Sequence, residues 1–236
     1  MAILLLGRDG AVAAEPTLSS EVDPFVCAQT VIAVDASEST ESSAFDRQRQ
    51  ALSDAFRHPR LAAAVQDCLP GSFGVAVLTW AGPGDQRVCA PWTVLRSAED
   101  LAGFAPMIEG CTHQGGTTDI GSAVDAALDL LERSPLMSHY RIVYLLTNGR
   151  TNDGAELRLE LARQAVERQG VTLAGHALLH RAVFWKAPRT RHDPFRRWVE
   201  IEVTAGPRSF TGASEPGEDA REILNALVRM LRQELQ

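Results

Sequence analysis

The chain has 236 residues, of which 45% are apolar and 22% are charged, and its formal net charge at pH 7 is −7. This length is enough for one α/β domain with a well-buried core, or for two small domains at most. The acidic balance argues against nucleic acid as a partner, and no apolar run approaches the roughly 20 residues that a membrane-spanning helix needs.

The first 24 residues are expected to form a leader or flexible arm ahead of the folded part. Residues 2–6 are apolar, and residues 11–14 (AVAA) resemble the small-residue cleavage site of an export signal. Arg8 and Asp9 interrupt the apolar run, however, and no basic segment precedes it. As written, this segment is therefore a poor secretory signal. Its cleavage-like residues point to a periplasmic or secreted location, and a cytoplasmic location is the alternative.

Residues 25–236 are expected to form a single domain, because strand and helix patterns alternate along them. Strands are predicted at 26–34, 73–80, 87–95, 141–147 and 171–178, with 203–210 as a loop or edge strand. Helices are predicted at 42–56, 61–68, 98–108, 120–133, 154–169 and 194–202, with 219–236 as a C-terminal helical extension. The turn at 82–85 predicts an antiparallel hairpin. The remaining alternation predicts a three-layer, doubly wound α/β fold, mostly parallel with one antiparallel edge strand.

Four cysteines, at positions 27, 68, 89 and 111, are widely spaced and contain no C-x-x-C pair. They fit neither a zinc knuckle nor a small disulfide scaffold. Two interpretations remain: buried free thiols, or one or two disulfides if the protein is exported.

The stretch from Thr30 to Thr40, TVIAVDASEST, organises the rest of the chain. A short β-branched run ends in Asp35, and two hydroxyls follow at Ser37 and Ser39. The carboxyl ends of strands in open α/β sheets are where ligands bind. One carboxylate and two hydroxyls there are hard oxygen ligands of the kind that magnesium or manganese prefers. The alternative is that these residues are ordinary turn and helix-cap residues.

Two further polar loops follow the same pattern. Gly115 and Gly116 precede Thr118, which lies just before the predicted helix 120–133. Asn148 directly follows the apolar run RIVYLLT. Taken alone, Thr118 is interpreted as a helix cap and Asn148 as part of a turn. In a doubly wound sheet, however, all three loops can meet at one edge.

Together these loops resemble the von Willebrand factor A domain. That family builds a metal-ion-dependent adhesion site from D-x-S-x-S, a threonine in a second loop and an aspartate in a third. The resemblance implies that Asp35, Ser37, Ser39 and Thr118 hold Mg²⁺ or Mn²⁺, with Asn148 in place of the third-loop aspartate. It also implies a protein partner whose Asp or Glu completes the coordination shell. This would be recognition, not catalysis.

A closer resemblance, to a bacterial von Willebrand-like family of unknown function, covers about residues 22–236. It is carried by the segments RQRQALSDAFRHPRLAAAV, VLTWAGPGDQRVCAPW, TDIG and GPRSF. The departure at Asn148 matters because an amide oxygen carries no charge, so divalent affinity is expected to be weaker. Glu38, Asp119 and Asp153 are near in sequence and are candidates to compensate.

Other chemistries find little support. The chain has no nucleophile elbow, P-loop, H-E-x-x-H or dinucleotide fingerprint. A hydrolase or phosphotransferase working from Asp35 is the alternative, although Ser37 stands where a second carboxylate is usual. Cys111-x-His113 could belong to a zinc site or a thiol nucleophile, but it is interpreted as incidental because no further ligand-spaced partner is present. The basic and aromatic segment 181–197 is interpreted as an arm that packs on the body, with a surface that binds nucleic acid or anionic lipid as the alternative. The histidines at 58, 139, 176, 180 and 192 are interpreted as solvated or turn residues.

Overall fold

The computed structural model describes residues 25–147, 155–178, 209–214 and 218–232. The predicted leader, the Asn148 loop, the segment 181–197 and the predicted helix 194–202 therefore lie outside the described residues.

A six-stranded sheet with the order β3-β2-β1-β4-β5-β6 forms the middle layer of the molecule. Its strands are β1 (Ala28–Asp35), β2 (Phe73–Trp80), β3 (Gln86–Leu95), β4 (Tyr140–Thr147), β5 (Thr172–Leu178) and β6 (Ser209–Ser214). β3 pairs antiparallel with β2, and each other neighbouring pair is parallel. The prediction of a mostly parallel sheet with one antiparallel edge strand is confirmed. β6, the edge strand beside β5, overlaps the segment 203–210 that was predicted as a loop or edge strand only at residues 209 and 210, and residues 203–208 lie outside the described residues.

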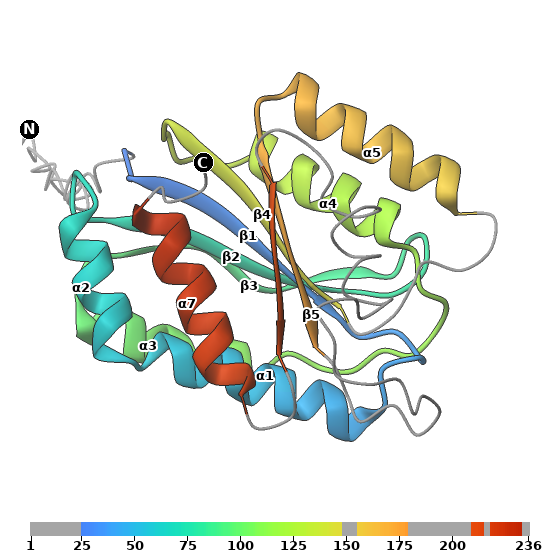
Figure 1. Ribbon diagram of the computed structural model, residues 1–236, viewed down its shortest axis with the longest axis horizontal. Coiled ribbons are helices and arrows are strands. Elements are labelled where there is room, and N and C mark those ends of the chain that lie inside the picture. The colour runs from blue at the N-terminus through green and yellow to red at the C-terminus, as the bar shows by residue number, and fades with distance from the viewer. Residues whose placement is uncertain (1–24, 148–154, 179–208, 215–217, 233–236) are drawn as a thin grey trace, which may run out of the picture.

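Helices cover both faces of this sheet (Figure 1). They are α1 (Ser42–Phe56), α2 (Pro59–Asp67), α3 (Ala98–Glu109), α4 (Ile120–Glu132), α5 (Glu156–Arg168) and α7 (Asp219–Arg232). α1, α2, α3 and α7 lie on one face, and α4 and α5 lie on the other. The central strand β1 is buried along its whole length, so both faces of the sheet need a covering layer of helices.

Alternation along β1 divides the core into two parts. Ile32 and Val34 pack into the cluster beneath α1 and α7, whereas Val31 and Ala33 pack into the cluster beneath α4 and α5. Successive strand residues point to opposite faces, so a fully apolar strand requires cover on both sides. By the same alternation, Asp35 belongs to the α4 face. Among the described residues, no helix is long and apolar enough to cross a bilayer.

The four cysteines form two disulfides, Cys27–Cys68 and Cys89–Cys111. The interpretation as buried free thiols is therefore wrong, and the disulfide alternative is confirmed. The first bond ties the start of the β1 region to the end of α2, and the second ties β3 to the residues that follow α3. The pairing was not visible in the sequence because the spacing alone allows three connectivities.

His176 also differs from its prediction as a solvated or turn residue. It lies in β5 with 1% of its surface exposed, and its ring meets that of Tyr144 edge-on at 6.4 Å between centroids. Burial disfavours the charged imidazolium and lowers the pKa of His176 from 6.5 to about 4. The histidine is therefore neutral in the folded protein at neutral pH.

This burial predicts acid sensitivity. The pKa of His176 is lower in the folded protein than in the unfolded chain, so between pH 6.5 and 4 the unfolded chain binds a proton that the folded protein does not. The folded state is therefore most stable above pH 6.5 and loses stability as the pH falls toward 4. We expect this group to lower the free energy of unfolding by roughly 2 to 3 kcal/mol between pH 7.5 and 4.5. Urea denaturation across that range measures the effect. His176→Gln should flatten the dependence, whereas His139→Gln, at an exposed ring, should not; equal curves for the two variants would contradict the assignment.

Candidate metal centre

The candidate centre lies at the carboxyl edge of the sheet, where β1 and β4 end side by side. Asp35 is the last residue of β1, and the loop 36–41 leads from it into α1. A second loop, 110–119, leads from α3 into α4 and carries Thr118. The parallel register that pairs Val34 with Leu146 brings the end of β4 level with the end of β1.

Three hydroxyl oxygens from these two loops form a nearly equilateral triangle. The Ser37 and Ser39 Oγ atoms are 2.9 Å apart, and Ser39 Oγ lies 3.0 Å from Thr118 Oγ1. The Thr118 hydroxyl donates to Ser37 Oγ over 3.0 Å, which closes the third side. Ser37 and Thr118 are buried, whereas Ser39 is exposed. The triangle therefore opens to solvent on the side of Ser39.

The Asp35 carboxylate lies directly behind this triangle and is fully buried. Its Oδ1 accepts hydrogen bonds from the Ser37 backbone N–H at 3.0 Å and the Ser37 hydroxyl at 2.6 Å. Its Oδ2 accepts from the Thr147 hydroxyl at 2.9 Å. The structure thus brings together four of the five residues predicted for the site. The fifth, Asn148, lies outside the described residues.

Thr147 is a site residue that our sequence reasoning missed. It is the final residue of β4, and its side chain is buried. A signal for it existed: β1 and β4 are both apolar strands that end in a polar residue, and in parallel register these two residues meet. The Ser37 and Thr147 hydroxyls thus each donate to one of the two carboxylate oxygens of Asp35.

The helix cap differs from the prediction for Thr118. Asp119, not Thr118, is the N-cap of α4, and its carboxylate accepts a hydrogen bond from the Ser122 backbone N–H at 2.9 Å. The same carboxylate forms an ion pair with Arg158 Nε at 3.0 Å. The Thr118 hydroxyl instead contacts the hydroxyls of Ser37 and Ser39. The cap and the ion pair also count against Asp119 as the compensating charge for Asn148.

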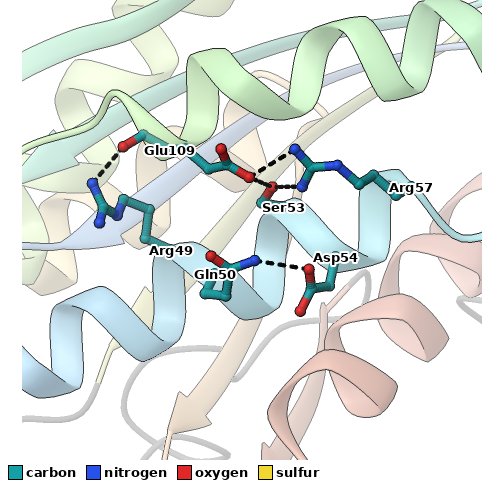
Figure 2. Close-up of polar contacts among 6 residues, drawn as sticks. All are labelled: Arg49, Gln50, Ser53, Asp54, Arg57 and Glu109. Carbon is teal, nitrogen blue, oxygen red and sulfur yellow. Dashed lines mark hydrogen bonds and ion pairs between the residues drawn. The ribbon is translucent and has the colours of Figure 1, made fainter.

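A polar network on α1 holds the beginning of the Thr118 loop (Figure 2). Arg49 donates to the backbone carbonyl of Glu109. It also donates to the backbone carbonyl of Cys111, which is not drawn, at 3.2 Å. Arg57 pairs with the Glu109 carboxylate at 2.7 Å, and Ser53 donates to the same carboxylate at 2.7 Å. The Ser53 hydrogen bond and the Arg57 guanidinium lower the pKa of Glu109. Helix α1 follows loop 36–41, and its side chains therefore hold the start of loop 110–119 in place.

Cys111 is bonded to Cys89, so it is neither a thiol nucleophile nor a zinc ligand. In the part of the chain that the structure describes, no three His, Cys, Asp or Glu side chains gather as a metal cluster. As far as the described residues go, the candidate centre consists of three hydroxyls with the Asp35 carboxylate behind them.

The family described as "Protein of unknown function (DUF1194)" matches residues 26–236. The chain belongs to this family. No curated protein sequence matches this family member significantly.

Solved structures show that this DUF1194 member has the von Willebrand factor A fold. BatB from Bacteroides thetaiotaomicron superposes with a TM-score of 0.58 at 15% identity, covering 87% of this chain and 98% of BatB. A von Willebrand factor type A protein from Catenulispora acidiphila gives 0.58 at 18% identity, covering 86% of this chain and 42% of its own. Proximal thread matrix protein 1 from the mussel byssus, described with a zinc-occupied MIDAS motif, gives 0.57 at 15%, covering 88% and 48%. The predicted resemblance to this fold is confirmed.

Proposed function

We propose that this protein is a non-enzymatic recognition module that binds Mg²⁺ or Mn²⁺ at the hydroxyl triangle and, through the ion, an acidic group of a protein partner. Ser37, Ser39 and Thr118 would supply direct oxygen ligands, and Asp35 the negative charge. Asn148 would be a neutral outer ligand from the third loop. When bound, the ion would supply a positively charged coordination position that a partner's Asp or Glu completes.

The observation that carries this proposal is the size of the triangle. Mg²⁺ binds oxygen at 2.0–2.1 Å in near-ideal octahedral geometry, so neighbouring ligands on one octahedral face are about 2.8–3.0 Å apart. The three hydroxyl separations are 2.9, 3.0 and 3.0 Å. Ca²⁺ binds oxygen at 2.3–2.6 Å, which requires about 3.3–3.7 Å for the same arrangement. The three separations match one face of a Mg²⁺ octahedron without any rearrangement of the hydroxyls, although they are also the distances at which the hydroxyls hydrogen-bond to one another.

Charge supports the role of an acidic partner group. The described carboxylate that contacts the triangle is that of Asp35, whose single negative charge only partly offsets the two positive charges of a divalent ion. A carboxylate from a partner would neutralise the remaining positive charge and occupy the open side at Ser39. The mussel protein's zinc-occupied motif supports the idea that this fold can hold a divalent ion at such a motif.

The two disulfides support an exported protein, because such bonds form and persist in oxidising compartments. We therefore place the recognition function in the periplasm or outside the cell.

Asp35→Asn should weaken Mn²⁺ binding by at least about tenfold, since it removes the charge while keeping the side chain's size. Calorimetric titration of the wild type should show Mg²⁺ and Mn²⁺ binding more tightly than Ca²⁺. Asp54→Asn is the matched control, because Asp54 is an exposed carboxylate on α1 bonded only to Gln50 in Figure 2, and it should leave affinity unchanged.

A wild type that binds none of the three ions, or an Asp35→Asn variant that binds Mn²⁺ as tightly as the wild type, would overturn the metal assignment. Phosphoester turnover that Asp35→Asn abolishes would instead overturn the non-enzymatic assignment.

A further inference from the structure

The hydroxyl triangle depends on two loops that are distant in sequence, 36–41 and 110–119. Ser39 and Thr118 are separated by 79 residues, yet their oxygens lie 3.0 Å apart. Backbone hydrogen bonds join the loops, including one from the Gly115 N–H to the Ala36 carbonyl at 2.9 Å. A displacement of one loop by a few tenths of an ångström would change the triangle, so whatever fixes the loops also fixes the candidate centre.

The side chain of His113, in loop 110–119, hydrogen-bonds to the backbone of loop 36–41. Its Nε2 atom lies 3.1 Å from the Ser37 carbonyl oxygen and 2.7 Å from the Thr40 carbonyl oxygen. Carbonyl oxygens only accept hydrogen bonds, so Nε2 carries the hydrogen and donates to both. The imidazole therefore binds the backbone of the serine loop from the threonine loop.

The segment that His113 binds is a closed turn. The Thr40 backbone N–H donates to the Ser37 carbonyl at 2.9 Å, which makes residues 37–40 a four-residue turn. Ser39, the exposed corner of the triangle, lies inside this turn. His113 thus holds both ends of the turn whose interior carries one candidate ligand.

The ring of His113 is itself held in place. It contacts the ring of Phe45 edge-on, with 5.6 Å between the centroids. Phe45 lies on α1 and is 1% exposed, so it has a fixed position in the core. The beginning of the His113 loop is anchored by the disulfide of Cys111 and by Arg49. A half-buried ring with these contacts has little freedom to leave the two carbonyls.

We propose that His113 is a positioning residue for the metal centre, which sets the Ser37–Thr40 turn so that the Ser37 and Ser39 hydroxyls complete the triangle with Thr118. This inference rests on the proposed function. It replaces the interpretation of Cys111-x-His113 as incidental. The histidine acts through the backbone of the ligand-bearing turn and does not bind the ion.

The chemistry defines a rescue experiment. Glutamine places an amide nitrogen close to the position of Nε2, and that NH₂ group can donate to two carbonyls. Asparagine carries the same amide group as glutamine on a side chain that is one carbon shorter. Its amide nitrogen reaches only the position of His113 Nδ1, so it does not reach the two carbonyls. We expect His113→Asn to weaken Mn²⁺ binding about ten- to hundred-fold, as loss of outer-shell support does at other metal sites. His113→Gln should recover most of the affinity.

Each variant is titrated with Mn²⁺ by calorimetry, and its urea midpoint is measured with and without Mn²⁺. A positioning role predicts a smaller Mn²⁺-induced stabilisation for His113→Asn than for His113→Gln. Equal Mn²⁺ affinity in wild type, Gln and Asn variants would overturn the role of His113 while leaving the metal assignment intact. A wild type that binds no Mn²⁺ would overturn the proposed function, and this inference with it. If His113→Asn does not fold, His113→Gln must still bind within a few-fold of wild type, and failure to do so overturns the proposal.

Discussion

Replacing Gly121 with alanine is expected to lower the free energy of unfolding by about 3 kcal/mol, because the added methyl group overpacks a close helix contact. A Cβ at this position in α4 would lie 2.6 Å from the Leu159 backbone nitrogen and 2.7 Å from the Arg158 carbonyl carbon of α5. These atoms belong to the helix backbone, so they cannot turn away as a side-chain tip would. α4 and α5 would have to separate.

Gly103→Ala is the matched control, because Gly103 lies inside α3 with no atom within 4 Å of an added Cβ. There the methyl group only restricts the unfolded chain and improves helix propensity, which should stabilise the protein by about 0.5–1 kcal/mol. In urea denaturation, we therefore expect the free energy of unfolding to fall for Gly121→Ala and to rise for Gly103→Ala. Shifts in the same direction would mean that the α4–α5 approach is not as close as described.

Removing the Cys27–Cys68 disulfide is expected to cost about 4 kcal/mol of stability, since it closes a loop with a sequence separation of 41 residues. Removing Cys89–Cys111, with a separation of 22, should cost slightly less, about 3 kcal/mol. Double alanine variants measured by urea denaturation test both values. Reduction of the wild type should reproduce the sum of the two losses.

The two bonds should differ in their effect on metal binding. Cys89–Cys111 anchors the loop that carries His113 and Thr118, so its removal should weaken Mn²⁺ affinity in addition to stability. Cys27–Cys68 lies at the start of β1, at the opposite end of that strand from Asp35. Its removal should leave the affinity of the folded fraction unchanged. Equal loss of affinity in both variants would show that the loop anchor has no specific role.

Much of the architecture could be predicted because its signals are local. The apolar run ending at Asp35, the turn at 82–85 and the amphipathic helix 120–133 each depend on neighbours within a few residues. Strand β2 and helix α1 begin and end at the residues predicted for them, 73–80 and 42–56. The hydroxyl and carboxylate positions could be proposed because they follow directly on such elements.

Side-chain roles that depend on partners far along the chain could not be predicted in the same way. Thr147 contacts Asp35 across 112 residues, and His113 contacts Ser37 across 76. The burial of His176 depends on the elements that cover β5. None of these is visible in a local pattern, because a polar residue has the same sequence signature whether it faces water or a buried carbonyl.

By itself, the sequence determined the alternation of strands and helices, and with it the parallel sheet, the antiparallel edge and the position of Asp35 at a strand end. These depend on periodicity and on turn residues, which act between near neighbours. Only the tertiary structure decided the disulfide pairing and the meeting of Ser37, Ser39 and Thr118 within 3.0 Å. Strand register and helix packing set those distances, and both arise when segments that are remote along the chain bury a common core.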